Sequence, residues 1–134
     1  MIVRHFLDWV RTAPAGKRAE ATAALARAYL YSDLSADDAA VAEGAMLILL
    51  DDPSPLVRRA LADALAASPS APPPVVLALA ADQPQIAAPV LALSPLFVDT
   101  DLVDAVATGN EDVRIAIASR SGLQRRARPD PLRG

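Results

Sequence analysis

Four pairs of close carboxylates are the side chains best placed to do chemistry, namely Asp37/Asp38, Asp51/Asp52, Asp99/Asp101 and Glu111/Asp112. Two carboxylates that share a cleft can divide general-acid and general-base roles. Neighbouring residues on a helix diverge by about 100°, however, and all four pairs fall at predicted helix starts or turns, where carboxylates stabilise helix ends. Capping is therefore the favoured interpretation, and no catalytic residue is predicted.

The sequence contains few residues that could bind a metal ion or a cofactor. His5 is the only histidine and the chain has no cysteine, which excludes multi-histidine and thiolate metal sites. The five glycines are scattered and form no phosphate-binding loop. Asp101 and Asp104 can share one helical face and hold a divalent cation weakly, but a site there is not predicted. We expect no enzyme, no metal and no cofactor.

An interaction surface is the remaining possibility, and its candidate residues are Phe6, Trp9, Arg58, Arg59, Arg114, Ile115 and Leu123. The single tryptophan, Trp9, stands out because tryptophan contributes strongly to interfaces. Together with Phe6 it belongs to an apolar N-terminal segment. That segment either caps the end of the fold or forms an exposed docking surface.

The arginines have two interpretations. Arg58 and Arg114 occupy equivalent positions in a repeated phrase, so we expect them to project from one side of the molecule. They form either a binding row or salt bridges to a neighbouring turn, such as those at Asp52 and Asp82. The row is short and lies in an acidic part of the chain, which argues against a nucleic-acid track.

The repeated phrase predicts the elements that carry these residues. Its anchors Val57, Ile86 and Val113 lie 29 and 27 residues apart, a spacing typical of stacked helical repeats. Two full units are predicted at about 51–81 and 82–108, followed by a partial unit at 109–122. The expected helices are 2–11, 15–31, 35–50, 54–67, 72–81, 84–93, 99–108 and 111–119.

Three local expectations follow from these helices. Ser35 with Asp38 resembles a capping box, and Pro89 is expected inside a helix, where it removes one backbone donor. The helix that begins near Ser35 is expected to turn four apolar residues inward, namely Val41, Ala45, Ile48 and Leu49.

The last unit lacks a second helix, and residues 123–134 are basic without an apolar period, so we predict a disordered tail there. An array that stops on half a unit leaves an apolar face uncovered, here around Val113, Ile115, Ile117 and Leu123. We expect that face to mediate self-association or to be covered by a partner. A shortened gene or an excised domain would also explain it.

Composition narrows the class further. Hydrophobic residues make up 53% of the 134 residues and aromatic residues 4%, so the core must consist of small aliphatic side chains. No run reaches the ~20 apolar residues of a membrane span, and a cytoplasmic location is predicted. Residues 33–112 contain thirteen acids and two bases, a balance of −11, whereas both ends of the chain are basic.

Asp52-Pro53, Val57-Arg58 and Ala60 are similar to a HEAT-type repeat, in which the arginine six residues after the aspartate bridges adjacent repeats. The second unit has Ala87 in place of the arginine, and the third has Thr108 in place of the aspartate. A ladder of such bridges is therefore not expected beyond the first unit.

A larger set of segments, in fixed order, resembles the uncharacterised alphaproteobacterial family called domain of unknown function 2336. The segments are Val57–Ala62, Leu77–Asp82, Ala88–Leu91, Ser94–Leu96, Asp99–Val103 and Ile117–Arg120. The resemblance covers about residues 15–123. It implies an all-helical, HEAT-like domain of a soluble bacterial protein and no catalytic residues.

The prediction as a whole is an all-α, HEAT-like α-solenoid, a right-handed superhelix of antiparallel helix pairs with about eight helices, in a single domain over residues 1–122. Its predicted function is a non-catalytic protein–protein interaction or scaffold module with an unknown protein partner and no membrane contact. Self-association as a homodimer through the uncapped solenoid end is one form of this prediction. A nucleic-acid-backbone binder is the alternative, which the acidic middle disfavours. A small enzyme with a cleft carboxylate is a third hypothesis.

Overall fold

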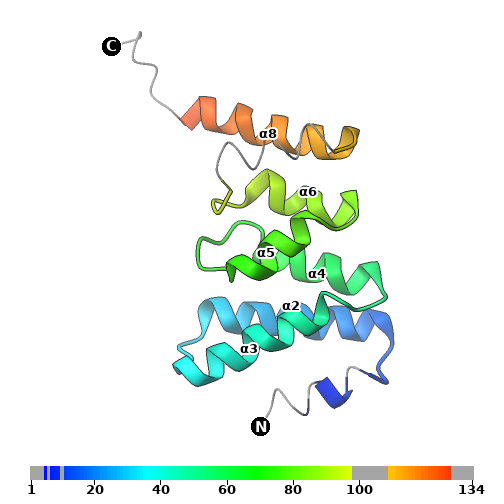
Figure 1. The fold of residues 1–134 in the computed structure, drawn as a ribbon. Helices are drawn as coiled ribbons and strands as arrows, with labels where there is room; N and C mark the ends of the chain where they lie inside the picture. Colours follow the sequence, from blue (N-terminus) through cyan, green and yellow to red (C-terminus); the bar gives the residue numbers. More distant parts are fainter. Residues whose placement is uncertain (1–4, 6, 10, 98–108, 128–134) are drawn as a thin grey trace.

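The computed structural model describes residues 5, 7–9, 11–97 and 109–127, and for residues 121–127 only the course of the backbone. These residues are helical and contain no strand (Figure 1). The bounded helices are α2 (Ala15–Tyr31), α3 (Ala36–Leu49), α4 (Pro55–Leu65), α5 (Pro73–Ala80), α6 (Pro84–Leu93) and α8 (Glu111–Ala127). The predicted all-α class is confirmed.

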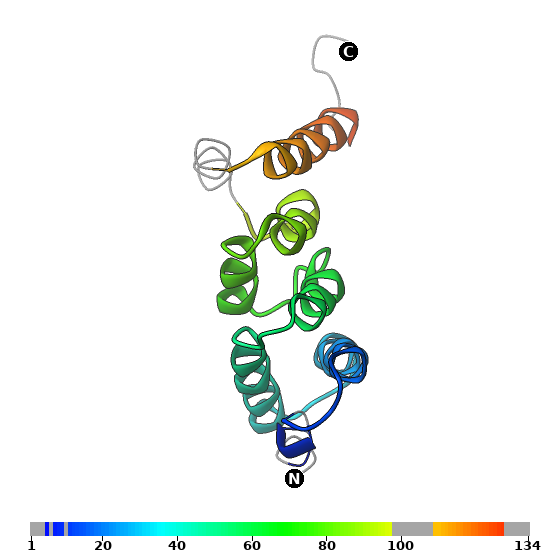
Figure 2. The ribbon, with the colours of Figure 1, turned by 90° about the vertical axis from the view of Figure 1, so that its right-hand side faces the viewer.

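The helices lie in two layers (Figure 2). One layer contains α2, α4, α6 and α8 in that order, with each helix packed on the next. The other layer contains α3 and α5, so the chain from α2 to α6 alternates between the layers. Because successive helices of the first layer run side by side, residues at the same position of each helix can interact with the start of the following one.

Proline and serine define the helix starts. Pro55, Pro73 and Pro84 each occupy the first position of a helix, where the missing N–H is not needed. Ser35 caps α3 by accepting a hydrogen bond from the Asp38 backbone N–H at 3.1 Å. The serine half of the predicted capping box is thus confirmed.

Pro89 lies inside α6, as predicted. Its nitrogen carries no hydrogen, so it cannot donate to the carbonyl of Gln85 four residues earlier. Arg59 of α4 supplies the missing donor, because its Nη1 donates to the Gln85 oxygen at 2.7 Å. A side chain of one helix therefore satisfies a backbone group that the next helix cannot satisfy itself.

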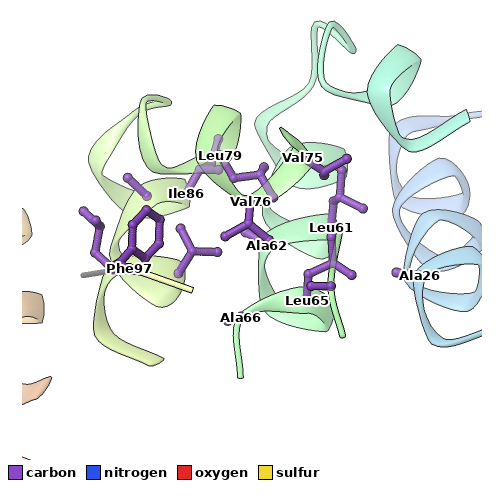
Figure 3. Close-up of a cluster of buried hydrophobic side chains, with 14 of the residues drawn as sticks. Ala26, Leu61, Ala62, Leu65, Ala66, Val75, Val76, Leu79, Ile86 and Phe97 are labelled. Atoms are coloured by element: carbon purple, nitrogen blue, oxygen red, sulfur yellow. The ribbon is translucent and has the colours of Figure 1, made fainter. Parts of the chain in front are cut away.

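The core lies between the two layers and consists of small aliphatic side chains (Figure 3). Leu61 and Leu65 of α4 are fully buried, as are Val76 of α5 and Ala26 of α2. Buried alanines allow the helices to approach closely, and close packing of aliphatic groups provides most of the stability of such a stack. The prediction of a core without many aromatic residues is confirmed.

The predicted inward face of α3 is partly wrong. Ala45 and Leu49 are buried, but Val41 is 38% exposed and Ile48 is 57% exposed. The reason is that α3 carries apolar residues on all sides, so its periodicity does not select a single face. The buried face is formed by Ala42, Ala45, Met46 and Leu49.

The predicted end of the last helix is also wrong, since α8 continues beyond Ser119 to Ala127 and includes residues 123–127 of the predicted tail. A glycine inside a helix costs only about 1 kcal/mol. Gly122 is therefore tolerated within α8 and does not end the helix. The predicted helix 99–108, residues 2–4 and the tail from 128 onward lie outside the described residues.

Candidate functional site

Two arginines, each the fourth residue of its helix, bind aspartates that precede the next helix of the same layer. Arg18 is the fourth residue of α2, and Arg58 is the fourth residue of α4. Arg18 binds the Asp52 carboxylate with Nε–Oδ2 and Nη2–Oδ1 distances of 3.0 Å each. Arg58 binds Asp82 with an Nε–Oδ2 distance of 2.8 Å and an Nη2–Oδ1 distance of 3.4 Å. We call these four residues the arginine ladder.

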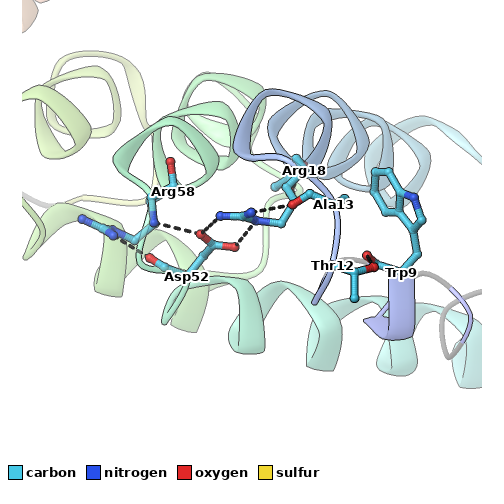
Figure 4. A network of polar contacts seen from close by, with 8 residues as sticks. Trp9, Thr12, Ala13, Arg18, Asp52 and Arg58 are labelled. Carbon is cyan, nitrogen blue, oxygen red and sulfur yellow. Dashed lines mark hydrogen bonds and ion pairs between the residues drawn. The ribbon is translucent and has the colours of Figure 1, made fainter.

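Each ladder arginine also binds a backbone carbonyl just before its own helix (Figure 4). Arg18 Nη1 donates to the Ala13 oxygen at 2.7 Å, and Arg58 Nη1 donates to the Asp52 oxygen at 2.6 Å. Asp52 therefore accepts from Arg18 through its carboxylate and from Arg58 through its carbonyl. The ladder links α2, α4 and the start of α6 into one continuous polar network.

The environment of Asp52 lowers the pKa of its carboxyl group below the ordinary value of 3.8. Burial on its own would raise that pKa, but hydrogen bonds from Arg18 and from the Ser54 backbone N–H outweigh it, as do the charges of Arg18 and Arg58. The hydrogen bond to Asp52 correspondingly raises the pKa of Arg18. Both members of the pair are thus held in their charged forms.

The salt-bridge interpretation of Arg58 is confirmed, with Asp82 as the carboxylate partner. The alternative prediction, that Arg58 belongs to an exposed binding row, is wrong because its side chain is only 12% exposed. The pair of Arg18 with Asp52 was missed. The signal that would have found it is the position of Arg18, four residues into its helix as Arg58 is in α4.

Among the described residues, α6 supplies no arginine for a further step, as the sequence predicted. Ala87 is the fourth residue of α6 and replaces the arginine. A pocket of about 420 Å³ lies there between α6 and α8, which we call the α6–α8 pocket. Its lining residues are Ala80, Ala81, Asp82, Pro84, Ala87, Leu91, Gly109, Asn110 and Val113.

The other predicted site residues are not brought together. Trp9 is 43% exposed and lies before α2, far along the stack from Arg114 and Ile115 of α8 (Figure 1). Arg59 is half exposed and pairs with Asp63 of its own helix at 2.9 Å. Phe6 and the side chain of Leu123 lie outside the described residues.

The face expected to be uncovered at α8 is mostly covered. Val113 and Ile117 are buried on the core side, and Ile115 is 57% exposed. Arg120 of α8 is also buried and donates hydrogen bonds to the backbone oxygens of Ser94 and Phe97 just beyond α6. Arg120 ends the family-like segment Ile117–Arg120 but was not among the predicted site residues. Its hydrogen bonds fasten α8 to the end of α6.

A different apolar surface is exposed on the other layer. It consists of Val41, Leu47 and Ile48 of α3 together with Leu77 of α5, which we call the apolar face. Their exposed fractions range from 38% to 57%. The two helices that carry them, α3 and α5, are in contact. Exposed large aliphatic side chains mark an interaction surface when they form one patch.

Within the described part of the chain, no three histidine, cysteine or acidic side chains converge on a position suited to a metal ion. Nor does that part include a helix with both the length and the apolar character needed to cross a bilayer.

Residues 86–127 match the sequence model of domain of unknown function 2336, described as an uncharacterised protein conserved in bacteria. The predicted resemblance to this family is confirmed over that segment, which is less than half of the chain. No curated protein matches the chain. No solved structure matches it either.

Proposed function

We propose that this chain is a non-catalytic protein–protein interaction module built as a HEAT-like α-solenoid. Two features support the solenoid. The chain alternates between two helical layers, and the fourth residue of α2 and of α4 makes the same bridge to the next helix start. Repeated units with such nearest-neighbour bridges form stiff scaffolds whose surface residues are available to partners.

The apolar face carries the interaction proposal. Large aliphatic side chains are normally turned toward the core, yet α3 exposes Val41, Leu47 and Ile48, and α5 exposes Leu77. Burial of apolar surface contributes about 25 cal/mol per Å². A partner that covers this face would therefore bury apolar surface that is exposed in the chain alone.

Charge indicates the kind of partner. The start of α3 carries Asp37 and Asp38, both exposed, and Glu43 follows within the same helix. A segment with apolar residues in its centre and basic residues at its edge complements this arrangement. Self-association through Ile115 of α8, which is exposed on a separate surface, is a second form of the proposal, and a cytoplasmic location belongs to the proposal as well.

Nucleic-acid binding finds less support. The residues from 33 to 112 have a net charge of −11, and Arg18 and Arg58 are engaged by carboxylates of the chain itself. A phosphate backbone would have to compete with those carboxylates for the same guanidinium groups.

Photocrosslinking in the cells that express the protein tests the proposal. A photoreactive phenylalanine analogue replaces Ile48 or Leu77 in the apolar face, or Leu56 of α4 as a control of similar exposure in the other layer. We expect adducts of defined mass from Ile48 and Leu77 and none from Leu56. A second copy as the adduct identifies self-association, whereas equal labelling from all three positions contradicts the proposal.

A further inference from the structure

The α6–α8 pocket lies where the next step of the arginine ladder would be. Ala87 holds the position that Arg18 and Arg58 hold in the preceding helices of the layer. Gly109 stands two residues before α8, as Asp82 stands two residues before α6. Both the cation and the carboxylate of this step are therefore replaced by residues too small to reach each other.

The pocket is large enough for the missing group. Liquid water occupies about 30 Å³ per molecule, so a volume of about 420 Å³ accommodates a guanidinium group with its methylene stem. Pro84, Ala87, Leu91 and Val113 provide apolar walls for such a stem. Long cationic side chains commonly place their stems along apolar surface in this way.

The polar part of the lining suits a guanidinium group. Asp82 is one of the lining residues. Its Oδ2 accepts a hydrogen bond from Arg58, and a carboxylate oxygen can accept a second one. Ala81 also lines the pocket and stands six residues before Ala87, as Asp52 stands six residues before Arg58. In the ladder it is the carbonyl of Asp52 that binds Arg58.

We propose that the α6–α8 pocket binds an alkylguanidinium group supplied from outside the chain. The guest places its methylene stem between α6 and α8 and its planar cation against Asp82, as the ladder arginines do with their own carboxylates. Guanidinium is favoured over ammonium because the planar fork satisfies a carboxylate and a carbonyl at once. This site is independent of the apolar face.

An NMR titration of ¹⁵N-labelled protein tests the proposal. The probe is N-acetyl-arginine methylamide, and the matched neutral control is the citrulline analogue. We expect saturable shifts at the amides of Ala87, Gly109 and Val113 with the arginine probe alone. Equal shifts with both compounds, or none with either, overturn the proposal.

Two variants sharpen the test. Ala87→Arg supplies the guanidinium from within the chain and should abolish binding. Gly109→Asp adds the missing carboxylate and should tighten binding about tenfold. If Ala87→Arg does not fold, the Gly109→Asp result decides, and unchanged affinity in that variant overturns the proposal.

The source of the guanidinium is read from two further probes. Agmatine represents a small metabolite, and a short peptide with a central arginine represents a protein. Tighter binding of either one assigns the source, and absence of binding by both contradicts the proposal. The titrations test the α6–α8 pocket and the crosslinking at Ile48 tests the apolar face. A negative result in one experiment therefore does not affect the other proposal.

Discussion

Arg58 of α4 and Asp82 at the start of α6 are joined by a 2.8 Å contact between Nε and Oδ2. Arg18 and Asp52 make the equivalent contact one helix pair earlier. In both pairs the side chains are mostly buried, with exposed fractions of 6% to 16%. Pairs in such surroundings fix the register of neighbouring helices, because an unpaired charge there is costly.

Removal of either partner of the Arg58–Asp82 pair should therefore destabilise the fold. We expect Arg58→Met and Asp82→Asn each to lower the free energy of unfolding by about 2 kcal/mol. The double variant should lose less than the sum of the two, which gives a coupling energy of about 1 kcal/mol or more. Urea unfolding followed by circular dichroism measures all four proteins of the cycle.

Asp63→Asn, which breaks the exposed pair of Arg59 with Asp63, is the control variant. It should lower the free energy of unfolding by only about 0.3–0.5 kcal/mol, the usual contribution of an exposed i,i+4 pair. Additive effects of Arg58→Met and Asp82→Asn would show that their contact does not stabilise the fold.

Arg59 should contribute mainly through the Gln85 carbonyl rather than through Asp63. Pro89 leaves that carbonyl without a helical donor, and Arg59 Nη1 supplies one at 2.7 Å. We expect Arg59→Met to cost about 1 kcal/mol in the native background and clearly less in a Pro89→Ala background, where the helix regains its own donor. Thermal melts of the four combinations measure this difference, and an equal cost in both backgrounds would refute the explanation.

A rebuilt third step of the ladder should stabilise α8 against α6. The double variant Ala87→Arg/Gly109→Asp places the two charges at the positions that Arg58 and Asp82 hold in the preceding step. We expect it to be more stable than the sum of the single variants predicts by about 1 kcal/mol. Unfolding by urea measures the coupling, and Ala87→Lys/Gly109→Asp is the control for charge without the planar fork. A coupling of zero would mean that α8 does not approach α6 as the preceding helices approach one another.

The pH dependence of stability should carry the signature of Asp52. Its pKa is lower in the folded chain than the ordinary value, so its contribution is fully present above an unfolded pKa of about 3.9. It is lost as the pH falls through the folded value. Melting temperatures of the wild type and Asp52→Asn should therefore differ by a constant amount near neutral pH and converge below about pH 4. A difference that grows on acidification would contradict the assigned pairing.

The elements of the first layer were predictable because local signals mark them. Pro55 and Pro84 announce helix starts 29 residues apart, and the apolar spacing after each proline selects the face that packs on the core. The pairing of Arg58 with a neighbouring turn followed from the same repeat. Asp82 was one of two carboxylates close enough in the repeat to serve as its partner.

Other features depend on contacts that no local pattern shows. Arg18 finds Asp52 34 residues away, and only the stacking of α2 on α4 brings them together. Val41 and Ile48 were placed inward because the apolar residues of α3 do not define a single face, and tertiary packing alone decides which side is buried. The α6–α8 pocket is lined by two small residues, Ala87 and Gly109, and no local pattern of the sequence indicates a cavity beside them.

The central claim is that the apolar face binds a protein, and the size of the native complex in cell extract tests it most directly. The wild type should elute from size exclusion well ahead of a monomer. Ile48→Lys/Leu77→Lys should elute as a monomer with an unchanged melting temperature, since exposed substitutions alter stability by less than about 0.5 kcal/mol. Leu56→Lys on the other layer should elute like the wild type. Identical elution of all three proteins would contradict the claim.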